Sequence, residues 1–360
     1  MENMAGLGIG LEKNFWFGKN VVITGHTGFK GSWLSLYLSY LGANISGLSL
    51  LPETSPNLFS SANVKNYISS YYCDLRDEKS VDLFFKKLTP DIIFHLAAKS
   101  LVQESYADPV NTYHTNVMGT VNLLNCARKL DTVKSIVVIT TDKVYKPRFS
   151  KTPYVEGDEL GGMDPYSASK SAVELIVNSF KKSYYEQNYV AISTARAGNI
   201  IGGGDWSKNR LVPDAVIAWE SNKTLKIRNP KAIRPWQFIL DPLQGYLSIA
   251  KSTFVDHKLA GAYNLAPSDD LNLSVEQFIN FSQEVYKNSH VEFEINNEFK
   301  YESEWLALDS SKARTNLGVN TQVSQIQAIQ KTFNWYKKFY QGASAYELCM
   351  QEIQEYERTL

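Results

Sequence analysis

Short apolar runs rich in β-branched residues alternate with longer helical patterns through the first half of the chain. The runs cover residues 21–23, 45–50, 92–94, 135–139 and 190–194. Continuous apolar strands that are separated by helices are typical of a parallel sheet covered on both faces. We therefore predict an α/β fold built on a doubly wound parallel sheet.

A glycine-rich turn connects the first predicted strand to a helix that begins at about Phe29, with the spacing Gly-x-x-Gly-x-x-Gly. Gly25 permits a tight turn, Gly28 lets the backbone approach a pyrophosphate, and Gly31 lets the helix pack close to the strand. The helix N-terminus offers N–H groups to the anion. A turn without a ligand is the alternative, but the strand–turn–helix context favours a dinucleotide site. Its predicted contacts are Gly25, Thr27, Gly28, Phe29 and Gly31.

The end of the second predicted strand bears on which dinucleotide binds. An acidic residue for the ribose hydroxyls is usual about twenty residues after the glycines. Residues 47–52 contain neither an acidic residue nor an arginine, and Glu53 comes late. Because no cation stands there to accept a 2′-phosphate, we predict NAD rather than NADP.

Tyr166 and Lys170 are four residues apart in a helix-compatible segment. At this spacing the two side chains share one face, so a lysine ammonium can lower the pKa of the neighbouring phenol and make it a usable base. The spacing alone arises often by chance, and the alternative is a packed aromatic residue beside a solvated lysine. Together with the glycine turn, the pair predicts chemistry on a hydroxyl group.

The pattern changes beyond residue 200, where a glycine triplet at 202–204, scattered prolines and shorter elements replace the regular alternation. Helical patterns return at residues 274–286 and 323–340, and the polar stretch after Gln341 has no assigned role. A chain of this length exceeds the usual size of one core. We predict a dinucleotide-binding domain over residues 1–198, to which segments near 236–265 can return. A smaller mixed α/β lobe over residues 199–360 would bind the substrate.

Charge and composition disfavour several classes of partner. The chain has 37 acidic and 37 basic residues, which argues against a nucleic-acid binder or a polybasic membrane anchor. Three irregularly spaced cysteines favour a reducing compartment, and five histidines without ligand spacing predict no metal site. No secretory signal or membrane span is recognisable. We expect a cytoplasmic protein whose partner is a small molecule or another protein chain.

Further motifs follow in a fixed order along the chain. They are Cys73-Asp74-Leu75, Leu96-Ala97-Ala98, Asn116 to Thr120, and Thr140 to Tyr145. With the glycine turn and the tyrosine–lysine pair, they resemble the extended short-chain dehydrogenases/reductases that act on nucleotide sugars, over nearly the whole chain. Within that family the chain is most similar to the 4,6-dehydratases of CDP-glucose, through residues 162–167, 199–206, 210–214 and 233–237.

The resemblance implies a Rossmann fold, bound NAD and a catalytic cycle. Tyr166 would be the base on the 4-hydroxyl of the sugar, Thr141 would hydrogen-bond the same hydroxyl, and Lys170 would bind the nicotinamide ribose and hold the phenolate. The cycle would oxidise C4, eliminate water across C5 and C6, and return the hydride to C6. Asp74 and Leu75 would contact the adenine. The residues implied to line the cofactor are Leu96, Ala97, Ala98 and Lys99.

Asp142 and Lys143 follow Thr141 directly. Elimination needs an acid at the leaving hydroxyl and a base at C5, so two adjacent ionisable groups at this point indicate a dehydratase. The resembled dehydratases of dTDP-glucose carry Asp-Glu here, whereas the CDP-glucose branch shows a lysine. Lys143 could act as the base only if burial beside Lys170 lowered its pKa. The alternative is a loop lysine that pairs with Asp142, for which we predict the acid role.

Guanidinium and amide groups beyond residue 198 are candidates for the substrate's diphosphate, because bidentate guanidinium groups match phosphate oxygens. For Arg196, a structural ion pair is an equally good interpretation. Trp206 could stack on the substrate or merely pack. The residues predicted to bind the substrate are Asn199, Asp205, Trp206, Arg210 and Arg234.

Two alternative functions stay open. A nucleotide-sugar 4-epimerase would share the turn, the tyrosine and the lysine, but it needs no proton donor at C6, where Asp142 is predicted to act. A non-catalytic NAD-binding regulator would have no use for an activated phenol. The resemblance further implies a homodimer, and a product that feeds deoxysugars into bacterial surface polysaccharide such as the lipopolysaccharide O-antigen.

Overall fold

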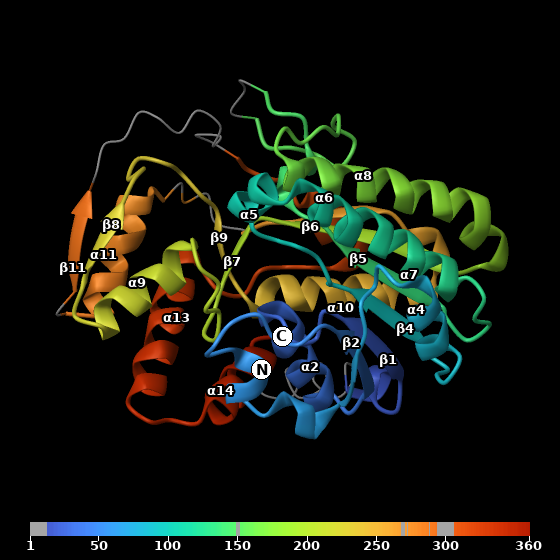
Figure 1. Ribbon diagram of the computed structural model, residues 1–360, viewed down its shortest axis with the longest axis horizontal. Helices are drawn as coiled ribbons and strands as arrows, with labels where there is room; N and C mark the ends of the chain where they lie inside the picture. Colours follow the sequence, from blue (N-terminus) through green and yellow to red (C-terminus); the bar gives the residue numbers. More distant parts are fainter. Residues whose placement is uncertain (1–12, 149–151, 268–270, 272, 288, 294–305) are drawn as a thin grey trace.

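A sheet of seven parallel strands forms the centre of the computed structural model, which describes residues 13–148, 152–267, 271, 273–287, 289–293 and 306–360 (Figure 1). The strand order is β10-β6-β5-β4-β1-β2-β3, and it reverses between β1 and β4. This order confirms the predicted doubly wound sheet. The strands are β1 (Asn20–Thr24), β2 (Asn44–Ser49), β3 (Ser69–Tyr72), β4 (Ile92–His95), β5 (Ser135–Ile139), β6 (Ala191–Ala197) and β10 (Ala262–Leu265).

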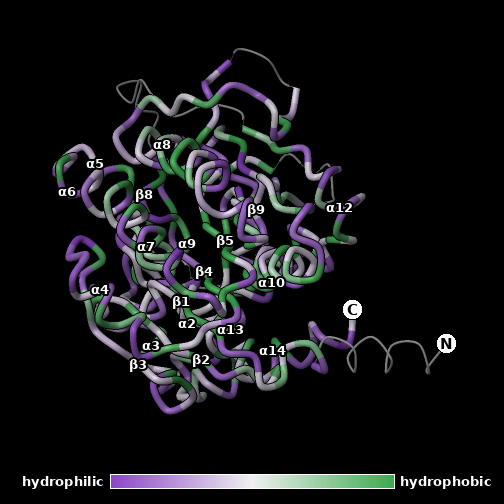
Figure 2. The backbone as a smooth tube through the Cα atoms, turned by 90° about the vertical axis from the view of Figure 1, so that its right-hand side faces the viewer, coloured by the Kyte–Doolittle hydropathy of each residue, from purple (hydrophilic) through white to green (hydrophobic). Residues whose placement is uncertain are grey.

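Both faces of the sheet are covered by helices. Successive strand residues point to opposite faces, and accordingly Val21 and Ile23 belong to one buried cluster while Val22 belongs to the other. The first cluster includes α2 (Phe29–Tyr40) and α10 (Leu240–Val255), and the second includes α4 (Glu78–Phe85), α7 (Gly119–Ala127) and α8 (Pro165–Phe180). Hydrophobic strands β4 and β5 lie at the centre of Figure 2. This double burial explains why the strands are apolar throughout.

Shorter helices and the second half of the chain complete the fold. The predicted helices near 274–286 and 323–340 are confirmed, and each begins at a capping box, at Ser274 and at Ser324. These remaining helices are α3 (Leu58–Ser61), α5 (Val102–Ala107), α6 (Pro109–Tyr113), α9 (Leu211–Glu220), α11 (Val275–Val285), α12 (Ser311–Leu317), α13 (Gln325–Tyr340) and α14 (Ala345–Glu357).

Two small parallel sheets lie outside the central one. β7 (Asn199–Ile201) pairs with β9 (Trp236–Phe238), and β8 (Thr224–Ile227) pairs with β11 (His290–Phe293). After β9 the chain returns along α10 to β10, which pairs with β6 at the edge of the central sheet. The β8/β11 pair, α9 and α11 gather at one end of the molecule in Figure 1. The exact division into two domains stays a prediction.

The last helix, α14, packs against α2 of the dinucleotide-binding half. Tyr356 donates to Asp241 Oδ1 at 2.8 Å, and Tyr37 of α2 donates to Glu357. The rings of Tyr67 and Tyr346 stack with centroids 4.6 Å apart. The stretch after Gln341, whose role the sequence left open, therefore ties the end of the chain to the glycine-turn helix.

Two further observations concern compartment and membrane. Cys73, Cys126 and Cys349 form no disulfide. Across the described ranges, each helix falls short of the length and apolar character needed to cross a bilayer.

Candidate active site

The glycine turn lies at the carboxyl end of β1, beside the reversal in strand order. Gly25 has a φ of +75°, and a Cβ there would lie 2.8 Å from the Ala97 nitrogen. A Cβ at Gly31 would lie 2.1 Å from the Gly25 oxygen, so both positions require glycine. A Cβ at Gly28 would contact only the Gly25 oxygen, at 3.4 Å, which is an ordinary van der Waals distance. The protein itself does not require glycine at position 28, which leaves close approach by a ligand as the reason.

The N-terminus of α2 adds to this fit. Within the described residues, no side chain caps the helix at Gly28. The first N–H groups of the helix therefore point to the space over the turn, where a pyrophosphate would accept from them. The site suits a dinucleotide, as the sequence predicted.

The predicted cofactor residues line the same edge of the sheet. The Thr27 hydroxyl donates to the Leu50 carbonyl at 2.9 Å and lies 2.8 Å from Ser49 Oγ, so it ties the turn to the end of β2. The Ala97 amide donates to Thr24 Oγ1 at 3.3 Å. The half-buried residues of the predicted set are Gly25, Phe29, Asp74, Leu96, Ala97, Ala98 and Lys99.

Two residues that were predicted to contact the cofactor form ion pairs within the protein. Lys99 Nζ lies 2.5 Å from Glu53, and the two segments follow β4 and β2, so the pair spans the end of β1 between them. Asp74 pairs with Arg76 at 2.5 Å, and hydrogen bonds from this guanidinium hold the pKa of Asp74 below its usual range. Leu75 is buried beside Asp74.

Thr141, Asp142, Lys143 and Tyr166 come together at the carboxyl end of β5. Thr141 caps the short turn η3 (Asp142–Val144) and donates to Asp142 Oδ1 at 2.9 Å, and its hydroxyl lies near enough to the Tyr166 phenol to lower the pKa of that phenol. Lys143 Nζ lies 3.1 Å from the same Asp142 oxygen. Asp142 and Tyr166 are only 2% and 8% exposed. Phenol, hydroxyl, carboxylate and ammonium thus form a continuous set of groups that can exchange protons.

Lys170, on α8, reaches the end of β5. It is buried and donates to the Ile139 carbonyl at 3.0 Å. Burial and then the charge of Lys30 lower the pKa of Lys170 to about 7, against the opposing charge of Glu174. Burial raises the pKa of Tyr166, and Lys143 is the foremost cation that opposes this rise. The expectation that Lys170 lowers the phenol pKa is therefore corrected, because Lys170 is turned toward β5.

The condition under which Lys143 alone could act as the base, a lowered pKa, is not met in this structure. Burial by itself would lower it, but Asp142 and Tyr166 act in the opposite direction and the net shift is upward. The side chain of Lys143 is 36% exposed. The structure shows Lys143 paired with Asp142, which is the alternative considered from the sequence.

Arg210 brings a guanidinium to this centre. Its Nη1 lies 2.9 Å from Asp205 Oδ2, and its Nη2 donates to Ser100 Oγ at 3.0 Å. The side chain of Asp205 is 8% exposed, so it orients Arg210 rather than facing the space of the site. Arg234 comes close enough to Lys143 to act on its pKa.

Gly198 lies beside the Asp142 carboxylate. A Cβ at Gly198 would lie 3.1 Å from Asp142 Oδ2 and 3.5 Å from Pro235. β7, which begins at Asn199, pairs with β9. Gly198 therefore lets the strand pair that carries Asn199 approach the buried Asp142 closely.

Trp206 is not brought to the site. It is 4% exposed, its ring packs against Trp335, Tyr336 and Phe339, and its Nε1 donates to Tyr340 at 3.2 Å. The predicted stacking role is corrected to a packing role, because the aromatic residues of α13 cover the ring.

The sequence reading missed Lys30, in the first turn of α2. Burial, followed by the charge of Arg210, lowers the pKa of Lys30 to about 8, while Asp142 and Asp205 act in the opposite direction. A charged residue between Phe29 and Gly31, directly after the glycine turn, was the available signal. Among the described residues, the centre thus gathers five cationic side chains against three acidic ones. They are Lys30, Lys143, Lys170, Arg210 and Arg234, and Asp142, Glu174 and Asp205.

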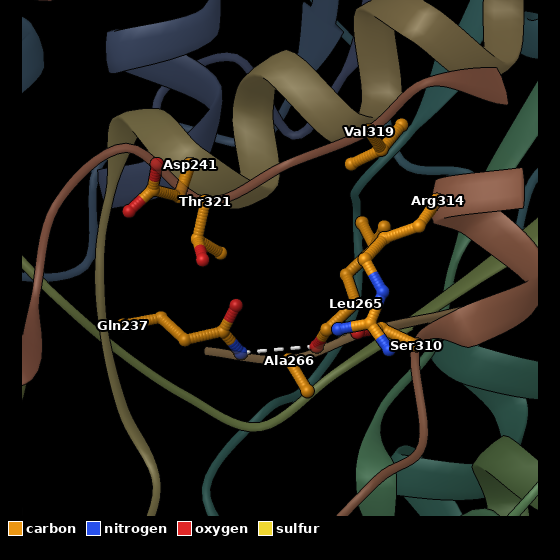
Figure 3. Close-up of a pocket in the computed structure, with 8 residues that line it drawn as sticks. All are labelled: Gln237, Asp241, Leu265, Ala266, Ser310, Arg314, Val319 and Thr321. Atoms are coloured by element: carbon orange, nitrogen blue, oxygen red, sulfur yellow. Dashed lines mark hydrogen bonds between the residues drawn. The ribbon is translucent and has the colours of Figure 1, made fainter. Parts of the chain in front are cut away.

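A small cavity lies apart from this centre. It encloses ≈ 10 Å³, room for about one water molecule, between β9, β10 and the segment after α12 (Figure 3). Gln237 Nε2 donates across its edge to the Leu265 carbonyl at 3.0 Å. No predicted site residue lines it.

Comparison with known proteins gives consistent matches over nearly the full length. The sequence signature of the family described as GDP-mannose 4,6 dehydratase matches residues 22–332. The chain is 38% identical over 352 residues to the CDP-glucose 4,6-dehydratase of Salmonella typhimurium, covering 96% of this chain and 98% of the relative.

Solved structures with lower identity share the fold. An epimerase from Methanothermobacter thermautotrophicus superposes with a TM-score of 0.79 at 24% identity, covering 92% of this chain and 96% of that one. The dTDP-glucose 4,6-dehydratase of Bacillus anthracis, solved in complex with NAD, gives 0.75 at 21% identity, covering 90% and 98%.

Proposed function

The chain belongs to the GDP-mannose 4,6 dehydratase family, and from this premise we propose that it is a hydro-lyase that converts CDP-D-glucose to CDP-4-dehydro-6-deoxy-D-glucose with NAD. The contacts of Asp142 with Thr141 and with Lys143, close to the Tyr166 phenol, carry the proposal. They provide proton-transfer groups for an oxidation and for an elimination in one place. The similarity to the Salmonella CDP-glucose enzyme supports the choice of substrate.

NAD would be held by the glycine turn, the N-terminus of α2 and the residues at the ends of β2 to β4. Bound NAD would supply the hydride acceptor at C4 and the hydride donor at C6. The open space at Gly28 and the uncapped helix support this placement. Lys170, held by the Ile139 carbonyl, would bind the nicotinamide ribose.

Tyr166 would take the proton of the 4-hydroxyl. Thr141 lies near the phenol, so a sugar hydroxyl placed against both groups would lose its proton to Tyr166 while Thr141 fixes its direction. The resulting 4-ketone acidifies the C5 proton, which prepares the sugar for loss of water.

Asp142 and Lys143 together would carry the elimination. The C5 proton must be removed and the O6 hydroxyl must be protonated, so the pair gives up one proton and gains one. Lys143 can accept at C5 only after its own proton has passed to Asp142, across the 3.1 Å contact between them. Asp142 then donates that proton to O6, and water leaves. The pair ends as ammonium and carboxylate, the form that the raised Lys143 pKa favours.

The surplus of positive charge at the centre suits a diphosphate. Arg210, which Asp205 holds in place, and Arg234 would donate hydrogen bonds to the diphosphate of the sugar nucleotide. Asn199 would be a neutral donor to the same group. Lys30 adds a cation between this group and the glycine turn. Trp206 has no place in this set.

One isotope experiment separates the three candidate functions. CDP-glucose deuterated at C4 is incubated with enzyme and NAD in ordinary water, and the label is located by NMR. We expect it at C6 of the product. Label retained at C4 with inverted stereochemistry would indicate an epimerase, and unchanged substrate would favour a regulator. Parallel reactions with dTDP-, UDP- and GDP-glucose test the base, with CDP-glucose expected to react fastest.

We also propose a homodimer acting in the cytoplasm. α6, the π-turn η2 (His114–Met118) and α8 carry the exposed apolar residues Val110, Met118 and Leu175, which are 76%, 44% and 63% exposed. Such a group of apolar side chains is typical of a contact surface. Sedimentation should give twice the chain mass of 40.6 kDa, and a monomer would contradict the proposal. The unpaired cysteines support a reducing compartment.

A further inference from the structure

A buried ion pair lies one helical turn beyond Lys170. Glu174 of α8 and Arg196 of β6 have side chains that are 3% and 4% exposed. Arg196 Nε and Nη2 donate to the two Glu174 oxygens at 3.0 and 2.8 Å. The geometry is bidentate, and the pair corresponds to the structural interpretation of Arg196 that the sequence allowed.

Each carboxylate oxygen of Glu174 accepts a second hydrogen bond. Thr140 donates to one oxygen at 2.5 Å, and Thr194 donates to the other at 2.8 Å. Thr140 directly precedes the catalytic Thr141, so Glu174 joins the helix of Tyr166 and Lys170 to the strand end that presents Thr141 and Asp142.

Arg196 extends the network away from the centre. Its Nη1 donates to the Tyr145 hydroxyl at 2.8 Å and to the Glu156 carbonyl at 3.1 Å. Tyr145 in turn donates to Asn264 of β10 at 2.6 Å. The pair therefore links α8, β5, β6, β10 and the segment after η3. Both Glu174 oxygens and all three Arg196 nitrogens have hydrogen-bond partners.

Stability alone does not explain such a pair. Apolar residues of similar volume often replace a buried ion pair without loss of stability, because both charges must be desolvated. A role in the reaction gives a reason for the charges at this place. The inference rests on the proposed function.

We propose that Glu174, held by Arg196, is a positioning residue of the reaction: it fixes α8 against the end of β5 and is the counter-charge of the Lys170 ammonium. Lys170 faces Lys30 from α2, His95 from β4, and Glu174 from its own helix. Burial lowers the pKa of His95 to about 3, so this ring is neutral. Of these groups, Glu174 is the one whose charge raises the pKa of Lys170.

The test separates charge from packing. Glu174→Gln leaves Arg196 buried without its partner and is expected to fold poorly. The double variant Glu174→Gln with Arg196→Met removes both charges at similar volume, and its melting temperature should return toward that of the parent. Without Glu174, the pKa of Lys170 should fall, because the charge that raises it is gone. The limb of the kcat profile that declines with rising pH should then move to lower pH.

The control is Glu159→Gln, which makes the same substitution in an exposed ion pair with Lys146. It should leave both the melting temperature and the pH profile unchanged. An independent readout needs no turnover: the ¹³Cε resonance of Lys170, assigned by its loss in Lys170→Arg, reports the titration directly.

The outcomes are distinguishable. If Lys170 titrates at the same pH in the parent and the double variant, the proposal is overturned. The same holds if the double variant folds and keeps the parental kcat profile. If the parent fails to convert CDP-glucose while the Lys170 titration shifts, the proposed function fails and only the charge coupling stands.

Discussion

Replacing Tyr166 with phenylalanine is expected to lower kcat roughly 1000-fold, with the affinity for NAD changed less than twofold. The substitution removes only the hydroxyl, which is the group that we propose to accept the 4-hydroxyl proton. Positioned general bases contribute rate factors of about 10² to 10⁴. The ring is 8% exposed and keeps its packing, so binding should persist. Turnover of CDP-glucose and calorimetric titration with NAD measure the two quantities.

The matched control is Tyr189→Phe, because Tyr189 is 71% exposed and lies far along the chain from the catalytic residues. It should retain parental turnover. Because the base acts as a phenolate and burial raises the pKa of Tyr166, kcat/KM in the parent should rise with pH through the neutral range. More than a tenth of parental turnover in Tyr166→Phe would remove this residue from the base role.

Asp142→Asn is expected to separate oxidation from elimination. The amide keeps the size of the carboxylate and can still accept from Thr141, but it cannot donate a proton to O6. The variant should oxidise C4 and stop, so that NADH absorbance appears in a single turnover and dehydrated product falls roughly 100-fold or more. Stopped-flow absorbance and NMR of the products measure the two steps.

Asp131→Asn, in the exposed loop before β5, is the control and should form product at the parental rate. Rapid product formation by Asp142→Asn would assign the acid role elsewhere. A loss of both steps would instead mean that Asp142 serves the arrangement of Thr141 and Tyr166. The expected result is the accumulation of the oxidised intermediate.

Local sequence determined the frame of this protein. Five apolar runs became strands of one parallel sheet, since residues buried on both faces must be apolar throughout. The glycine turn could also be predicted from the sequence. Gly25 and Gly31 are required by close contacts with residues a few positions away or at the end of the neighbouring strand. The helical spacing of Tyr166 and Lys170 placed both on α8.

Tertiary structure decided the electrical environment of the site. Burial and partners from distant segments set the direction of each pKa, so Lys143 retains its proton beside Asp142 and Lys170 turns to β5 instead of acting on the phenol. Trp206 packs against the aromatic residues of α13 and does not reach the site. Such neighbours come from segments widely separated in the sequence, and local spacing holds no information about them.

The ion pair of Glu174 with Arg196 and the position of Lys30 at the centre also depend on contacts between segments that are far apart in the sequence. Residue type and spacing fixed which groups the chain carries and on which elements they sit. Only the packing of α2, α8 and β6 around one sheet edge fixed which charges meet. Coulomb interactions act across space and depend on burial, whereas a sequence pattern records only distance along the chain.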